Sequence, residues 1–240
     1  MTVPLQTAIP YCGAAPEPAE WLARWNGDPV LLLLLAAGAV LAGRGRVGVA
    51  FWWGYALLLL LFLSPLCALS SALFSVRVVH HVALTAIAAP LLVAGMRRLR
   101  VPGAAASWAA GHALIFWFWH TPDAYGAALS SDAAYWAMQL TLLGSAMGFW
   151  TALRQSSAPL AIGLLLAMMV QMGLLGALIT FAGVPLYAPH YASTLAWGLT
   201  PLADQQLGGI VMWAPAAGLY LGAALRRGWR LLAPRAAGAA

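Results

Sequence analysis

The feature that most constrains this chain is the spacing of its charged residues, which stand far apart between long apolar stretches. Charged residues make up 8% of the 240 residues and apolar residues 63%, whereas a soluble domain carries about 25% charged residues. A transmembrane helix needs roughly 20 consecutive, mostly apolar residues, and several of the uncharged stretches reach that length. The chain is therefore predicted to be an all-α, polytopic membrane helix bundle that has the lipid bilayer as its solvent.

Charged residues and prolines divide the apolar stretches into about seven predicted transmembrane helices. The first has a short apolar core, Val30 to Ala42. Before the last helix, Pro185, Pro189 and Pro201 predict a loop. The predicted helices are 28–43, 50–70, 77–96, 103–121, 132–153, 158–182 and 204–225.

The arginines predict the orientation of the bundle. All 12 basic residues are arginine, and under this helix count only Arg24 and Arg77 fall on the side that also holds the six acidic residues. Basic loops stay in the cytoplasm, so the N-terminus is predicted outside and the C-terminus inside. The predicted parts are an extracytoplasmic tail (1–27), a transmembrane domain (28–225) and a cytoplasmic tail (226–240). The net charge of +6 thus reflects topology, and no nucleic-acid partner is expected.

Other sequence motifs narrow the function. No phosphate-binding loop, no GxSxG and no HExxH is present, and no enzymatic activity is predicted. Cys12 and Cys67 are both expected outside, where a disulfide is possible in an oxidising compartment. The sequence alone does not decide whether it forms.

Histidines gather near the predicted outer face. His80 and His81 begin the third helix, His120 ends the fourth, and His190 lies in the loop before the seventh. Only His112 lies deeper, two turns below His120 on the same helical face. Neutral imidazole binds copper, zinc, iron and nickel, so this grouping predicts a metal site at the outer ends of the helices.

Two further residue types bear on that site, and each also has a purely structural interpretation. Met212 lies two turns below Asp204, and a thioether adds a preference for Cu(I), but methionine is also a common filler of apolar packing. Asp204 either caps the seventh helix or supports the site, and both roles are compatible. Neighbouring side chains on a helix diverge by roughly 100°, so one of His80 and His81 is expected to be structural.

Three segments together resemble the CtaG-type family of cytochrome c oxidase assembly factors, which are polytopic bacterial membrane proteins. The resemblance covers roughly Phe51 to Leu225, and the third segment is the most specific. Where many members carry a histidine one turn before the position of His81, this chain has Arg77. The segments read RVVHHVALTAIAAPLLVAG (77–95), FWFWHTPDAYGAAL (116–129) and WGLTPLADQQLGGIVMWAP (197–215).

This resemblance implies a multi-pass protein of the bacterial cytoplasmic (inner) membrane that acts with haem–copper oxidase subunits, and with an extracytoplasmic copper donor protein. Residue chemistry and resemblance lead to one hypothesis, in which His81 and His120 bind Cu(I). The third ligand would be His190, Met212 or, in place of the missing histidine, His80. Asp204 would orient one imidazole by accepting its second N–H.

Three other functions remain open. Two histidines at one depth could ligate haem axially. A copper transporter would use deeper steps such as His112, Met168 and Met172, although no ligand cluster follows on the inner side.

The third alternative is a metal-free scaffold that holds an oxidase subunit during assembly. Small-residue pairs on two helices, Gly144 with Gly148 and Gly173 with Gly176, permit close helix contacts. Such contacts would form within one chain or between two copies, so a homo-oligomer is possible.

Overall fold

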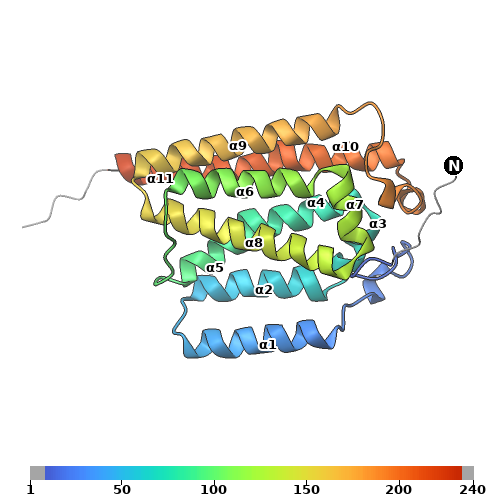
Figure 1. The fold of residues 1–240 in the computed structure, drawn as a ribbon, viewed down its shortest axis with the longest axis horizontal. Coiled ribbons are helices and arrows are strands. Elements are labelled where there is room, and N and C mark those ends of the chain that lie inside the picture. The colour runs from blue at the N-terminus through green and yellow to red at the C-terminus, as the bar shows by residue number, and fades with distance from the viewer. Residues whose placement is uncertain (1–8, 234–240) are drawn as a thin grey trace, which may run out of the picture.

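The computed structural model describes residues 9–233, and every regular element within that range is helical (Figure 1). The long helices lie side by side as a bundle (Figure 1). The α-helices are α1 (Pro29–Arg44), α2 (Val49–Leu63), α3 (Leu66–Ala72), α4 (Phe74–Val82), α5 (Ala89–Gly95), α6 (Ala105–Trp119), α7 (Pro122–Ser130), α8 (Asp132–Gln155), α9 (Ala158–Thr180), α10 (Pro201–Val211) and α11 (Ala217–Leu232). Shorter 3-10 turns are η1 (Trp21–Ala23), η3 (Ala188–His190) and η4 (Thr194–Trp197), and π-helical turns are η2 (Ala83–Ala88) and η5 (Met212–Ala216).

Each of the seven predicted ranges contains helix, with three differences. The second range is broken at Ser64–Pro65, where α2 and α3 meet at a bend of 51°, because a proline restricts the residue before it and has no N–H to continue the helix. The short helix α7, between the fourth and fifth ranges, was not predicted. The last helical stretch is longer than predicted and runs from Pro201 to Leu232.

These boundaries also bear on the predicted tails. Because α11 continues to Leu232, the first residues of the predicted cytoplasmic tail are helical. Residues 234–240 of that tail, and residues 1–8 of the predicted outer tail, lie outside the described residues.

Three helices among the described residues are long and apolar enough to cross a membrane. The bent pair α2 and α3 makes a fourth if it is counted as one span, and α1 is a shorter apolar helix. The membrane character predicted from the sequence therefore has direct support. The three helices are Phe74–Gly95, Ala158–Thr180 and Pro201–Leu232.

Two of these spans contain a π-helical turn beside a proline. Pro90 follows η2, and Pro215 lies inside η5. A proline inside a helix removes one backbone hydrogen bond and clashes with the carbonyl four residues earlier, and a widened turn accommodates that clash. Such turns occur frequently at functional sites; here η2 begins two residues after His81, and η5 begins at Met212.

Glycines allow close contacts between the helices of the bundle. A Cβ added to Gly209 of α10 would lie 2.7 Å from the carbonyl oxygen of Gly176 on α9. A Cβ on Gly148 of α8 would lie 2.2 Å from the Trp108 ring of α6. Gly148 and Gly176, two of the four glycines predicted to permit close helix contacts, therefore make such contacts within one chain.

The two ends of the bundle differ in charge. The α1–α2, α5–α6 and α8–α9 connections and the end of α11 all lie at one end, which is named here the arginine end (Figure 1). The N-terminal segment, α3, α7 and the α9–α10 connection lie at the opposite end, which is named the histidine end (Figure 1). The described arginines of the arginine end are Arg44, Arg46, Arg97, Arg98, Arg100, Arg154, Arg226, Arg227 and Arg230.

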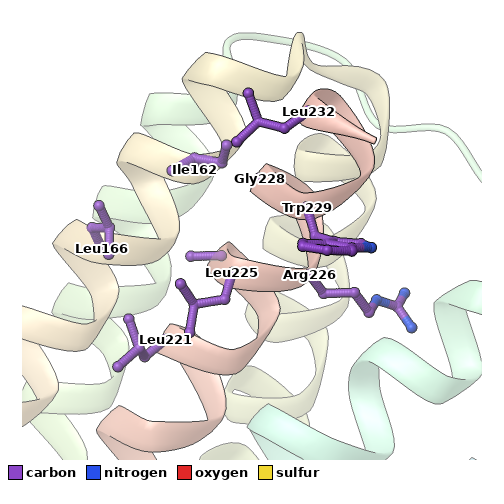
Figure 2. Close-up of a pocket in the computed structure, with 9 residues that line it drawn as sticks. Ile162, Leu166, Leu221, Leu225, Arg226, Gly228, Trp229 and Leu232 are labelled. Carbon is purple, nitrogen blue, oxygen red and sulfur yellow. The ribbon is translucent and has the colours of Figure 1, made fainter. Parts of the chain in front are cut away.

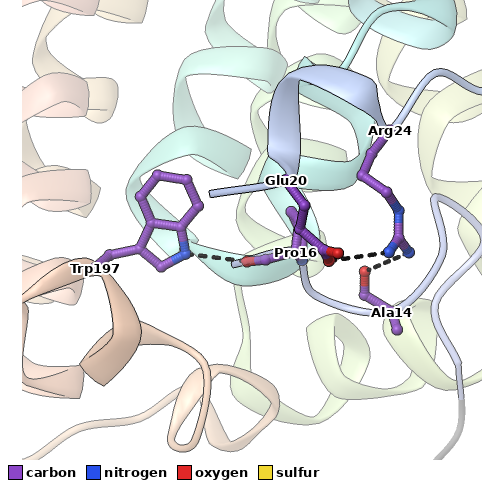
Figure 3. A network of polar contacts seen from close by, with 5 residues as sticks. All are labelled: Ala14, Pro16, Glu20, Arg24 and Trp197. Carbon is purple, nitrogen blue, oxygen red and sulfur yellow. Dashed lines mark hydrogen bonds and ion pairs between the residues drawn. The ribbon is translucent and has the colours of Figure 1, made fainter. Parts of the chain in front are cut away.

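Residues 9–28, named here the N-terminal cover, are fastened to the histidine end. A disulfide joins Cys12 to Cys67 of α3, so the pairing that the sequence left open is formed. The Tyr11 ring stacks on Tyr135 of α8 with 4.8 Å between centroids. Figure 3 shows the indole N–H of Trp197 donating to the carbonyl oxygen of Pro16 at 3.2 Å. The same view shows the Arg24–Glu20 ion pair of the cover, at 3.2 Å.

Candidate functional site

Three of the predicted ligands meet in the interior of the histidine end. His80 and His81 lie on α4, and His120 directly follows α6. All three are buried. The ring centroids of His81 and His120 are 5.4 Å apart, and those of His80 and His81 are 5.9 Å apart. Helices from distant parts of the chain thus bring these imidazoles together away from water.

The hydrogen bonds fix how His120 can bind a ligand. Its Nδ1 lies 2.7 Å from the carbonyl oxygen of Phe116, and a carbonyl only accepts, so Nδ1 carries the proton and donates. Nε2 is then left with a lone pair, and it has no hydrogen-bond partner. This is the usual way in which a protein prepares a neutral imidazole as a metal ligand.

His81 is less constrained, because neither of its ring nitrogens has a hydrogen-bond partner. A metal–imidazole nitrogen bond is about 2.0 Å long, so the ring centres of two histidines on one ion lie at most about 6 Å apart. The separation of 5.4 Å between His81 and His120 satisfies that limit. The distance between the two rings alone therefore does not prevent both imidazoles from reaching one metal ion.

His80 has a partly structural role, as expected for one of the two neighbours. Its Nε2 lies 3.2 Å from the carbonyl oxygen of Leu61 and donates to it, and its Nδ1 has no partner. No group of three or more His, Cys, Asp or Glu side chains that could hold a metal is found in the part of the chain that the structure describes. A third ligand of these types is therefore not already in place beside His81 and His120 in the described residues.

The other two predicted ligands are buried on different elements. His190 is buried in η3, with Nε2 2.6 Å from the Tyr125 hydroxyl, and its ring contacts Tyr125 and Phe74 rather than another histidine. Burial, with a further contribution from the positive charge of Arg77, lowers the pKa of His190 to about 3, so its ring is neutral at physiological pH. Met212 is fully buried at the start of η5, which packs against α4.

Asp204 has a different role from the predicted orientation of an imidazole. Its carboxylate accepts hydrogen bonds from the backbone N–H of Phe74 at 2.6 Å and of Ser75 at 3.2 Å, and from the Ser75 hydroxyl. A carboxylate at this position satisfies the free N–H groups that begin α4. Asp204 therefore caps the helix that carries His80 and His81, and no hydrogen bond joins it to a histidine among the described residues.

Arg77 is the residue whose burial the sequence did not predict. The sequence placed it at the outer end of the third predicted helix, as an exception to the positive-inside pattern, and in the structure its side chain is fully buried. Its guanidinium carbon lies 5.4 Å from the centre of the Tyr135 ring, and none of its three side-chain nitrogens has a hydrogen-bond partner. A buried charge of this kind is the main polar feature that the sequence analysis missed, although its spacing of four residues before His81 was visible.

The remaining histidine and an apolar groove lie away from the His81–His120 pair. His112 is bonded through Nδ1 to the Ser145 hydroxyl at 2.9 Å and stacks on Phe149. Figure 2 shows an apolar groove between α9 and α11 near the arginine end, with Arg226 and Trp229 beside it. Its lining offers no metal ligand, so it is not a second candidate for the metal.

Fold and site together define a helical membrane protein with a buried cluster of histidines and one arginine at one end. The chain belongs to the cytochrome c oxidase caa3 assembly factor family (Caa3_CtaG), whose family model matches residues 33–233. This match confirms the resemblance seen in the three sequence segments. No match was found among curated proteins or among solved structures.

Proposed function

We propose that this protein takes part in the assembly of a caa3-type cytochrome c oxidase by binding Cu(I) between His81 and His120 and passing it to the oxidase. The observation that carries this proposal is the free lone pair of His120 Nε2, which faces no protein donor, next to a second buried imidazole at 5.4 Å. Membership of the family supports a role in oxidase assembly, and the paired imidazoles support the binding of copper.

Cu(I) suits this environment because it accepts soft and neutral ligands. Met212, His190 or His80 would complete the set, and each is buried at the same end of the bundle. With neutral ligands only, the loaded site keeps a positive charge near the buried cation Arg77. Coulomb repulsion in a medium of low dielectric weakens binding, which favours transfer to a partner over storage.

The proposal includes the orientation and location of the protein. Seven transmembrane passes, with the N-terminus outside and the C-terminus in the cytoplasm of a bacterium, would place the arginine end inside and the histidine end outside the inner membrane. The positive-inside rule supports this, because the described arginines gather at one end of the bundle (Figure 1). Helices α1, α6 and α8 run alongside the three apolar spans in the same bundle (Figure 1).

This placement puts the copper site on the side where an extracytoplasmic copper donor and the oxidase subunits would meet it. The protein itself would act as a carrier and not as an enzyme, since transfer of an ion between ligand sets breaks no covalent bond. A metal-free scaffold is the second candidate, and it is favoured by the lack of a group of three His, Cys, Asp or Glu ligands among the described residues.

The two candidates are separated in cells that lack the gene and carry a variant copy. We expect His81→Asn and His120→Asn to yield oxidase that contains haem but is depleted in copper, whereas His112→Asn, a buried histidine outside the pair, yields normal oxidase. Copper and haem are measured in the isolated oxidase, with membrane levels of each variant as the control. Fully copper-loaded oxidase from the double variant His81→Asn/His120→Asn would refute the proposal and leave the scaffold.

A further inference from the structure

Arg77 is a buried positive charge without a counter-ion. The only ion pair among residues 9–233 is between Arg24 and Glu20. The Nε, Nη1 and Nη2 atoms of Arg77 all lack hydrogen-bond partners, and the side chain is fully buried. An isolated charge in an apolar interior is strongly unfavourable unless it is paired.

The protein does not supply the missing partner. Asp204 is the acid on the neighbouring helix α10, but its oxygens already accept three hydrogen bonds from Phe74 and Ser75. The groups that surround the guanidinium are instead neutral aromatic side chains. The Tyr135 ring lies 5.4 Å from the guanidinium carbon, and the Tyr125 hydroxyl is hydrogen-bonded to His190 Nε2 at 2.6 Å.

We propose that Arg77 binds a carboxylate, with the hydroxyl of Tyr135 as an additional donor. The guanidinium presents a planar fork of N–H donors that matches the two oxygens of a carboxylate. None of the three nitrogens has a hydrogen-bond partner within the protein, and each is covered by neighbouring side chains. A carboxylate must therefore displace these side chains to reach the fork, and a spherical halide would match the fork less well. The bound carboxylate neutralises the charge beside the histidine cluster.

The N-terminal cover limits what can reach this site. Tyr11 stacks on the outer side of Tyr135, and the sulfur of Cys12 lies 3.4 Å from the Tyr135 hydroxyl. With the cover held by the disulfide to Cys67, a small free carboxylate enters more readily than one carried by a larger molecule. The carboxylate could belong to a small free anion or to a larger molecule. Both present the same group to Arg77, and they differ in size.

Formate is the probe for a direct test, because it is the smallest carboxylate. Equilibrium dialysis of radiolabelled formate against the detergent-purified, copper-free full chain should show about one formate per chain. Arg77→Met should abolish this binding, and the exposed Arg98→Met should retain it. Absence of saturable binding to the wild type, or equal binding to Arg77→Met, would overturn the proposal.

Milder variants keep the test decisive if Arg77→Met does not fold. Arg77→Lys keeps the charge but loses the bidentate fork, and Tyr135→Phe loses one hydroxyl donor, so each should weaken formate binding by about 10-fold or more. Unchanged affinity in both would contradict the assigned site. Equal displacement of formate by chloride at the same concentration would contradict the carboxylate class.

Two further experiments identify the source of the carboxylate and distinguish this proposal from copper binding. Tight binding of formate but not of succinate indicates a small free carboxylate, whereas comparable binding of both indicates a carboxylate carried by a larger partner. His81→Asn/His120→Asn should bind formate normally, because the carboxylate site does not depend on the metal. Loss of formate binding in that variant, with the fold intact, would contradict the assignment to Arg77 and Tyr135.

Discussion

The two ends of the bundle use arginine in opposite ways. At the arginine end, Arg154 donates to the carbonyl oxygens of Val93 at 2.6 Å and of Met96 at 3.1 Å, and also to that of Leu99. These carbonyls lie at and just after the end of α5, so the Arg154 side chain caps the C-terminal end of this helix. At the histidine end, Arg77 is more deeply buried and has no such partner.

The comparison separates polar groups that hold the fold together from polar groups that are available to ligands. The arginine end satisfies its charges with backbone carbonyls and solvent. The histidine end leaves Arg77, His81 and His120 Nε2 unpartnered inside the protein, where each unpaired polar group destabilises the fold. A binding site requires such unpaired groups, because a ligand can bond only to donors and acceptors that the protein has left unused.

The largest expected effect concerns the disulfide that closes the histidine end. Cys12 and Cys67 are 55 residues apart in the sequence, and a cross-link over such a loop stabilises by about 4 kcal/mol in the chain-entropy model. Cys12→Ser/Cys67→Ser should therefore lower the Tm by roughly 10 °C. Thermal unfolding in detergent measures this, and a reductant should lower the Tm of the wild type but not of the double variant. A wild-type Tm that does not respond to reductant would contradict the role of the disulfide.

A smaller effect of opposite sign is expected at the two arginines. Arg154→Gln loses charged hydrogen bonds to three carbonyls and should destabilise by about 3 kcal/mol. Arg77→Met removes an unpaired charge and keeps the volume, so in formate-free buffer it should be neutral or stabilising by about 1 kcal/mol. If Arg77→Met is as destabilising as Arg154→Gln, the distinction between the two ends is wrong.

The smallest effect is expected at Asp204. Asp204→Asn keeps the shape but weakens the cap of α4, and loss of a cap typically destabilises by about 1 kcal/mol. Copper stoichiometry should be unchanged, because the carboxylate contacts Phe74 and Ser75 and not a histidine. A loss of copper without a loss of stability would restore the originally predicted role in orienting an imidazole.

Helix positions were predictable because charge is excluded from apolar spans. Every predicted range contains helix, since arginines and acids marked the ends. The helix α7 was not predicted because it has only nine residues, although Pro122 and Asp123 are helix-start signals. The bend at Pro65 was also signalled by the proline, but its angle depends on packing.

The site was predictable only in part, because its key contacts join distant segments. His81 and His120 were singled out from their depth on two separate helices together with the family resemblance. The role of Asp204 depends on Phe74, 130 residues away, and the burial of Arg77 depends on Tyr135 of α8 and on α10, which packs against α4. Periodicity within one helix carries no information on such partners.

The most direct test of the account is anaerobic Cu(I) binding by the detergent-purified full chain. Stoichiometry and affinity are compared for the wild type, His81→Asn, His120→Asn and the matched buried control His112→Asn, and the visible spectrum of each sample is recorded to detect haem. The account predicts about one Cu(I) per chain, lost in both variants of the pair and retained in the control, with no haem absorption. Copper retained after loss of both His81 and His120, or no copper in the wild type, would contradict it.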